Sequence, residues 1–446
     1  MKFRSIAAAV TATLLAAGVT TTASATTPAD TGNRLMHRDY DSSDTLPWSG
    51  PGAQGKQKWS IPGGACSTVL QASDKAILAL CTQYVGFDNG ITPAAPSVVW
   101  FDGNTAKVVD KLELPKSGLL GGVYGFLDEQ DRVVLMLGNQ ITRIGRVDGK
   151  LAIVDRKELD GVPADATSAG LTPDPSGNIW FATKSSLIGS LTPDGTVRTL
   201  QLPEGEKITN GLTSRPDGVS VITSEALYEV AGPDPKVTWS YKYDSGSARK
   251  PGQLSKGSGT TPTFFGPSNN YVGIVDNADN SPNFIVLNAA NGREVCKLPA
   301  FTVGGPGTEN SAMAWGNSVW IPSTYGFNYP PMAVDGPSKP LIAPFTGGLT
   351  RIDVTDQGCE RVWENNTRFS TLPVLTRGDG KIWALSSNPG SLGVDLIGVD
   401  AATGREEVRR PAGLLPADEP LQLTGTVTPD GSLWQATATR MLKFEG

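Results

Sequence analysis

The sequence predicts an all-β protein, an eight-bladed β-propeller with four strands in each blade. Turn-forming residues are abundant, since 52 glycines and 33 prolines make up about a fifth of the 446 residues. A short unit, a tight turn followed by an apolar strand, occurs eight times after residue 57. Successive copies end 41 to 63 residues apart, a spacing that fits one four-stranded propeller blade per copy.

Each copy of the repeated unit has the chemistry of a β-hairpin. Asp-Gly pairs allow the positive φ angles of tight turns, and the alternating apolar residues that follow suit a half-buried strand. We therefore assign one copy to each blade. The copies are residues 73–77, 130–134, 176–180, 217–221, 269–272, 316–320, 379–383 and 430–434.

The two ends of the propeller are expected to meet in one blade. Residues 58–62 resemble an outermost strand but precede the first repeat, whereas only residues 440–444 follow the last repeat as a further strand. We predict that residues 58–62 complete the eighth blade, because this closure removes free sheet edges. Residues 58–446 then form a single propeller domain.

The first 25 residues have the pattern of a secretory signal peptide. Lys2 and Arg4 precede an apolar stretch over residues 6–19, and Ala23-Ser24-Ala25 is a typical cleavage site. The sequence thus predicts a bacterial protein that is secreted after cleavage near Ala25. Residues 26–57 are rich in Thr, Pro, Asp, Ser and Gly, so we expect a flexible leader.

Composition excludes several classes of function. The net charge of −6, without runs of like charge, argues against nucleic acid as a partner. No second long apolar run follows the signal peptide, so we expect no membrane partner, and we expect a monomer. His37 is the only histidine, which argues against most Ser-His-Asp schemes and against any mechanism that uses two imidazoles.

Four cysteines in a secreted chain predict two disulfides. In a two-residue hairpin centred on residues 73–74, Cys66 lies opposite Cys81, so we expect these two to pair. Cys296 and Cys359 are then left to each other, with no argument from local spacing. Free buried thiols are the alternative.

Two segments resemble the quinoprotein-like (PQQ-like) propellers, which are eight-bladed. Residues 400–405 match the D-x-x-T-G turn of that family, and residues 288–293 are similar to it. The resemblance implies the fold, but the family's docking tryptophan is replaced by Val408 in one blade and by Cys296 in the other. The chain also has no vicinal cysteine pair. These departures argue against bound PQQ and against a PQQ-type oxidoreductase, the third of the functions considered.

One blade is similar to a blade of streptogramin B lyase. The similar residues are 174–181, 188–191 and 193–195. That family needs a catalytic histidine in its propeller, and residues 58–446 contain none. We therefore expect no lyase activity of that kind.

The loops on one face of the predicted ring are unequal in length. Residues 82–97 form a long loop in the first blade, and the other long loops belong to blades five and six, at residues 244–262, 276–283, 301–311 and 323–348. We expect an off-centre pocket there, because long loops on one face of a propeller build the binding site. Thr260 and Thr261 could bind an anion or a sugar hydroxyl. The alternative is that their hydroxyls only satisfy backbone groups at the channel.

Carboxylates in these loops suggest a divalent cation, with Ca²⁺ as the first candidate. Asp276, Asp279 and Glu309 are the candidate ligands, and Asn310 lies beside the last of them. The types of Glu309, Asn310 and Asp276 resemble the metal ligands of the gluconolactonase and senescence-marker propellers. A plain Asx turn is the alternative for residues 276–280. A buried Glu309 would need a cation or a donor such as Arg, and it is the candidate catalytic residue.

Aromatic residues in the sixth-blade loop could bind a carbohydrate or a peptide. Tyr325 and Tyr329 would form the platform, and a self-packed Ω-loop is the alternative. The function favoured by the sequence is binding of a small-molecule, carbohydrate or peptide ligand over blades five and six. The alternative is a metal-assisted hydrolase or lyase with carboxylate ligands at the central channel.

Overall fold

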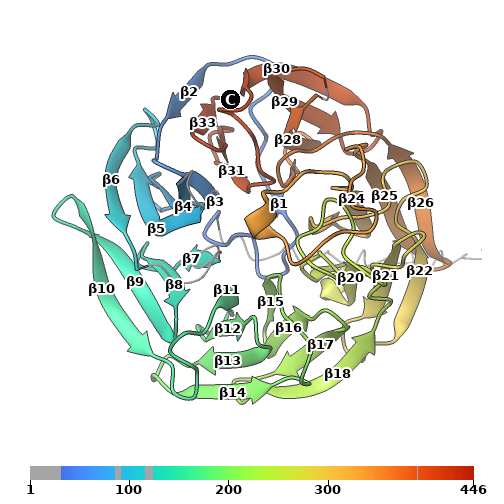
Figure 1. Cartoon of the computed structure of the whole chain (residues 1–446), viewed down its shortest axis with the longest axis horizontal. Coiled ribbons are helices and arrows are strands. Elements are labelled where there is room, and N and C mark those ends of the chain that lie inside the picture. Colours follow the sequence, from blue (N-terminus) through green and yellow to red (C-terminus); the bar gives the residue numbers. More distant parts are fainter. Residues whose placement is uncertain (1–31, 86–91, 116–123, 389) are drawn as a thin grey trace, which may run out of the picture.

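The computed structural model describes residues 32–85, 92–115, 124–388 and 390–446. The predicted signal peptide and the start of the predicted leader lie outside the described residues, as does part of the first-blade loop. Eight sheets surround a central axis, and each has four antiparallel strands ordered from the inside outward (Figure 1). The sheet of the seventh blade has a fifth strand, which pairs in parallel with its innermost strand. The predicted eight-bladed propeller is confirmed.

Blades one to four each use four consecutive strands. They are β3 (Ala65–Gln71), β4 (Ile77–Val85), β5 (Thr92–Phe101), β6 (Val108–Glu113); β7 (Gly125–Leu127), β8 (Val133–Leu137), β9 (Gln140–Val147), β10 (Lys150–Glu158); β11 (Ser168–Pro173), β12 (Ile179–Thr183), β13 (Leu187–Leu191), β14 (Val197–Gln201); β15 (Leu212–Arg215), β16 (Gly218–Ile222), β17 (Ala226–Ala231) and β18 (Lys236–Lys242).

Blades five to eight add two strands from the N-terminal part of the chain and two short 3-10 helices. They are β19 (Thr263–Phe265), η1 (Pro267–Asn269), β20 (Tyr271–Val275), β21 (Asn283–Asn288), β22 (Glu294–Pro299); β23 (Met313–Trp315), β24 (Ser318–Pro322), η2 (Pro331–Ala333), β25 (Leu349–Thr355), β26 (Gly358–Asn365); β27 (Val374–Thr376), β28 (Lys381–Ser387), β29 (Gly393–Asp400), β30 (Glu406–Leu414), with β1 (Thr45–Leu46); and β31 (Gly425–Val427), β32 (Leu433–Ala436), β33 (Met441–Phe444), with β2 (Gln57–Ser60).

The ring closes as the sequence predicted. Strand β2 is the outermost strand of the eighth blade and pairs antiparallel with β33, with Trp59 opposite Leu442. The repeated unit of the sequence forms the turn and second strand of every blade, because each copy ends in the strand that follows the innermost one. Local turn chemistry therefore fixed both the number of blades and their boundaries.

The cores between blades depend on close contacts between large and small residues. Trp180, Trp383 and Trp434 are fully buried on the second strands of blades three, seven and eight. Gly398 lies opposite Trp383, and a Cβ atom there would meet the indole at 2.7 Å. A glycine is needed at that position because protein interiors are packed without space for an added methyl group.

The prediction of a flexible leader over residues 26–57 is wrong for residues 32–48. Residues 32–48, which we call the N-terminal strap, wind through the central channel of the ring and are largely buried (Figure 1). Strand β1 within the strap pairs in parallel with β27, with Thr45 beside Leu375. The polar composition suggested solvent exposure, but the partners of these polar groups come from distant blades.

Backbone carbonyls of the strap accept hydrogen bonds from the innermost strands of five blades. The donors are the amides of Gln71, Leu127, Phe264, Ala314 and Leu375, in blades one, two, five, six and seven. The corresponding acceptors, Asn33, Arg34, Asp41, Ser43 and Asp44, follow the same order along the strap. An innermost strand is a sheet edge, so the strap satisfies groups that would otherwise lack partners in a narrow channel.

Both predicted disulfides are present. Cys66 and Cys81 are bonded and lie opposite each other in the hairpin of β3 and β4. The hairpin turn is one residue longer than predicted, and a bulge at Ser67 restores the register at the two cysteines. The second bond joins Cys296 on β22 to Cys359 on β26, so it links the outermost strands of blades five and six.

Candidate functional site

A cavity of about 170 Å³ lies on the ring axis, bounded by the strap and by residues of seven blades. The prediction of an off-centre pocket over blades five and six is therefore wrong in its placement. Those blades do supply one wall, from residues 254–261, 309–311 and 329–333. The cavity is central because the starts of the innermost strands converge on the axis, which loop length alone does not reveal.

Glu309 is a buried, uncharged carboxyl group in the cavity wall. Its Oε2 accepts a hydrogen bond from the Leu254 amide at 3.0 Å, and its Oε1 has no partner among the described residues. Burial raises the pKa of Glu309 to about 8, although Arg249 and the Leu254 amide act in the opposite direction. The carboxyl group is thus mostly protonated at pH 7, and the predicted pairing with an arginine is absent among its described contacts.

The carboxyl group of Glu309 lies against residue 259, where the chain has a glycine and no side chain. A Cβ atom on Gly259 would lie 2.6 Å from both Cα and Oε2 of Glu309. The amide of Glu309 also donates to the Thr324 hydroxyl at 2.8 Å. Blade five therefore provides space for this side chain, and the sixth-blade loop fixes its backbone.

Asn310 is the second polar residue of this wall. Its Nδ2 donates to Oε1 of Gln422 at 3.0 Å, and Gln422 in turn donates to the Phe369 carbonyl at 2.7 Å. The Oδ1 atom of Asn310 has no partner among the described residues. Two adjacent residues of the cavity wall therefore each retain one buried oxygen without a hydrogen bond, an arrangement that is costly unless something else pairs with it.

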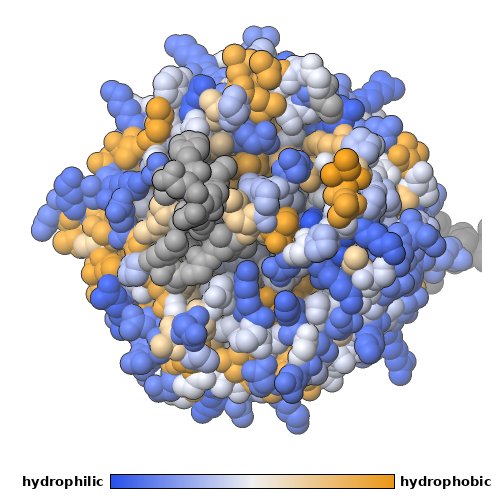
Figure 2. Space-filling model, in the orientation of Figure 1, coloured by the Kyte–Doolittle hydropathy of each residue, from blue (hydrophilic) through white to orange (hydrophobic). Residues whose placement is uncertain are grey.

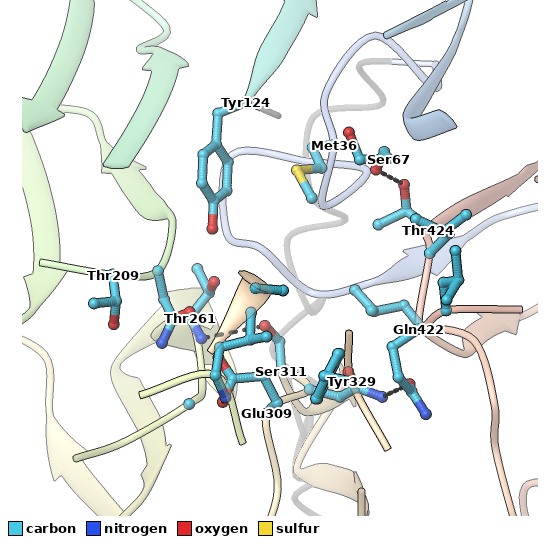
Figure 3. Close-up of a pocket in the computed structure, with 18 of the residues that line it drawn as sticks. Met36, Ser67, Tyr124, Thr209, Thr261, Glu309, Ser311, Tyr329, Gln422 and Thr424 are labelled. Carbon is cyan, nitrogen blue, oxygen red and sulfur yellow. Dashed lines mark hydrogen bonds between the residues drawn. The ribbon is translucent and has the colours of Figure 1, made fainter. Parts of the chain in front are cut away.

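The two predicted threonines have different surroundings. The Thr260 hydroxyl contacts the Val275 amide and the Ser258 hydroxyl, so it satisfies neighbouring groups, as the alternative proposed. Thr261 lines the cavity (Figure 3). Its amide donates to the Ser311 hydroxyl at 3.2 Å, and its own hydroxyl lies 3.3 Å from Nε2 of His37.

His37 was not predicted as a site residue, because the sequence places it in a segment expected to be a flexible leader; Tyr124 and Gln422 were not predicted either. The strap places His37 in the cavity wall, where it is 8% exposed. Its Nδ1 lies 3.0 and 3.2 Å from the two carboxylate oxygens of Asp44. The signal in the sequence was that this single histidine is followed by three aspartates within seven residues. Composition alone does not show that one of these aspartates contacts the imidazole.

The predicted metal ligands do not come together. Asp276 accepts hydrogen bonds from Asn283 and Ala278 and forms an ion pair with Lys297 at 3.3 Å. Asp279 accepts a bond from the Ser247 amide near the surface. Among the described residues there is no group of three or more His, Cys, Asp or Glu side chains arranged to hold a metal ion. The Asx turn, the alternative for residues 276–280, agrees with these contacts.

The aromatic platform predicted from the sixth-blade loop is also different in the structure. Tyr329 lines the cavity, and its pKa is raised by burial. Its ring packs edge-on against Phe327 at 5.0 Å, and Phe327 packs in the same way on Phe345 at 5.5 Å. Tyr325 is not among the cavity residues. The loop is thus packed on its own side chains, as the Ω-loop alternative predicted.

Tyr124 faces Thr261 and Glu309 across the cavity, as Figure 3 shows. Burial raises the pKa of Tyr124, so its hydroxyl stays protonated at neutral pH. Gly211 lies where these groups meet. A Cβ atom there would be 3.2 Å from both the Thr261 hydroxyl and the Tyr124 ring, and 3.6 Å from Nε2 of His37.

Comparison with known proteins supports the fold without assigning a family. No protein-family model and no curated protein matches the chain. The structure is similar to the Dos1 propeller, with a TM-score of 0.57, 10% identity, and coverage of 89% of this chain and 94% of that one. It is also similar to a streptogramin B lyase, with a TM-score of 0.48, 14% identity and coverage of 87% and 96%. A third similar structure is a catalytically inactive virginiamycin B lyase from Staphylococcus aureus with quinupristin. Its TM-score is 0.46, with 15% identity and coverage of 74% of this chain and 95% of that one.

Proposed function

We propose that this propeller binds a small, uncharged molecule in its central cavity. The observation that carries the proposal is that Glu309 and Asn310, adjacent residues of the cavity wall, each have a buried oxygen with no partner among the described residues. A protonated Glu309 can donate a hydrogen bond, and the Asn310 oxygen can accept one. A ligand with an adjacent acceptor and donor, such as a cyclic amide, would pair with both.

The size of the cavity favours a small molecule over a carbohydrate or peptide chain. A closed cavity of about 150 Å³ holds a molecule the size of benzene, and the volume found in this ring is about 170 Å³. On the face shown in Figure 2, apolar residues are interspersed with polar ones rather than gathered in one continuous surface. This arrangement supports the cavity, rather than that face, as the binding site.

The compartment is part of the proposal. Two disulfides are consistent with an oxidising environment, as the predicted secretion after cleavage near Ala25 would require. None of the described helices is both long and apolar enough to cross a membrane.

2-Pyridone is a suitable probe, because its ring carries a carbonyl acceptor next to an N–H donor. Ligand efficiencies of about 0.3 to 1.5 kcal/mol per non-hydrogen atom bound the affinity of small ligands, so the seven non-hydrogen atoms of 2-pyridone correspond to about 2 to 10 kcal/mol, a Kd of tens of millimolar or tighter. Calorimetry should detect binding at pH 6 and a loss of affinity above pH 8, where Glu309 ionises and no longer donates.

N-methyl-2-pyridone is the matched control, since it lacks the donor and should bind at least tenfold more weakly. Gly211→Ala should also weaken binding of 2-pyridone, because its methyl group occupies space beside Thr261 and Tyr124. Equal affinity for both pyridones, or affinity that does not change across pH 6 to 9, would contradict the assignment of Glu309 and Asn310 to the ligand.

A further inference from the structure

Three polar side chains from two distant parts of the chain form a continuous relay at the cavity wall. The Thr261 hydroxyl contacts His37, and His37 contacts Asp44. We propose that these residues activate Thr261 as a nucleophile toward a small, uncharged ester bound in the cavity. The proposal rests on the proposed function in one respect, because the substrate would occupy the same cavity.

The hydrogen bonds fix the direction of the relay. A carboxylate can only accept, so the proton of the imidazole lies on Nδ1, 3.0 Å from Asp44. The Nε2 atom is then an acceptor, and the Thr261 hydroxyl, 3.3 Å away, donates to it. A hydroxyl that donates to an imidazole held by a carboxylate is the arrangement that activates hydroxyl nucleophiles on unrelated folds.

The backbone of the strap holds the imidazole and the carboxylate together. The amide of Asp44 donates to the carbonyl of His37 at 3.3 Å, so the strap turns back on itself between them. Arg38, Ser42 and Asp44 have φ angles of 76°, 53° and 51°, in the left-handed region that residues other than glycine seldom adopt. Such conformations persist only where the surroundings enforce them.

The surroundings do enforce this turn. The Arg38 guanidinium donates to the Gly425 carbonyl and to the Thr426 hydroxyl of blade eight. The Ser42 hydroxyl accepts a hydrogen bond from Thr213 of blade four at 2.9 Å. The turn is therefore anchored on opposite sides of the ring, and His37 and Asp44 are positioned before any ligand binds.

The reaction balances without a metal or a second reagent other than water. The Oγ atom of Thr261 forms a bond to the ester carbonyl carbon, and its proton moves to Nε2 of His37, while Asp44 stabilises the imidazolium. The carbon–oxygen bond to the leaving alcohol then breaks, and that alcohol takes the proton from Nε2. Water cleaves the acyl-threonine by the same route and releases the acid.

Glu309 stabilises the negative charge that develops during the proposed reaction. Its protonated carboxyl group lines the same cavity and can donate a hydrogen bond to a carbonyl oxygen as negative charge develops there. A charged carboxylate at that position would instead repel the developing charge.

The probe for the test is a small dialkyl fluorophosphate, which reacts with activated hydroxyls by forming a phosphorus–oxygen bond and releasing fluoride. We expect one adduct per chain, on the peptide that contains Thr261. His37→Gln and Asp44→Asn should each slow labelling at least 100-fold. Thr261→Ser should be labelled and Thr261→Val should not.

Melting temperatures of all variants establish that each one folds. If His37→Gln or Asp44→Asn does not fold, Thr261→Val still tests the proposal, because valine keeps the shape of the threonine side chain. Absence of the adduct in the folded wild type, an adduct only at another residue, or a labelling rate unaffected by His37→Gln would overturn the proposal. Binding of 2-pyridone on the same samples is an independent readout. Binding without labelling refutes the activity alone, and labelling without binding refutes the proposed ligand alone.

Discussion

Replacing Glu309 with glutamine should change how the free energy of unfolding depends on pH. Burial raises the pKa of Glu309 to about 8 from an ordinary 4.5, and each unit of difference between folded and unfolded states corresponds to about 1.4 kcal/mol. Below pH 4.5 the group is protonated in both states. As the pH rises toward 8, the unfolded chain releases the proton while the folded protein keeps it, so stability falls by at most about 5 kcal/mol.

Glutamine has the same shape and cannot ionise, so this loss should disappear. Urea denaturation of both proteins at half-unit intervals from pH 4 to 9 gives the difference in unfolding free energy. We expect that difference to be nearly constant below pH 4.5 and then to grow in favour of Glu309→Gln. Asp39, whose pKa burial raises to about 7, contributes equally to both curves and cancels. Parallel curves over the whole range would refute the buried, protonated state of Glu309.

Three further predictions concern the strap, the second disulfide and the glycine of the cavity wall. Leu46→Ala should lower the free energy of unfolding, measured by urea denaturation, by about 2 to 5 kcal/mol, because this side chain is 2% exposed in the core of blades seven and eight. A loss below about 0.5 kcal/mol would mean that the strap is not docked. Replacing both Cys296 and Cys359 with serine should lower the free energy of unfolding by about 4 kcal/mol, because the unfolded chain gains entropy when this 63-residue loop is no longer closed. An unchanged melting temperature would contradict this prediction. Gly259→Ala should lower the melting temperature, since its Cβ would lie 2.6 Å from a backbone atom, and equal stability would show that the wall can move.

The propeller was predictable because its determinants are local in the sequence. A turn such as Asp379-Gly380 and the strand after it specify a hairpin by themselves, and eight hairpins at blade spacing leave few architectures open. The pairing of Cys66 with Cys81 followed from the same hairpin, even though a bulge corrected its register. Closure by β2 followed from counting strands.

The strap was not predictable, because its burial depends on partners that are distant in the sequence. Arg38 and Asp39 read as solvated residues until their partners are known, and the Arg38 guanidinium contacts blade eight almost 390 residues away. The prediction of a metal site was wrong for a similar reason. Asp276 has the right oxygen ligands for a cation, but its partners are Asn283 and Lys297 on the neighbouring strands of its own blade.

The position of the strap connects folding of the ring to formation of the site. Its carbonyls pair with the innermost strands of blades one, two, five, six and seven, so the strap can dock fully only after those blades have assembled around the axis. His37 and Asp44 lie within that docked segment, whereas Thr261 and Glu309 belong to blades five and six. The relay is therefore complete only in the closed ring. A substitution that loosens the strap, such as Leu46→Ala, should consequently reduce labelling of Thr261 more than it reduces binding of 2-pyridone, because the side chains of Glu309 and Asn310 bond to Leu254 and Gln422 in the ring rather than to the strap.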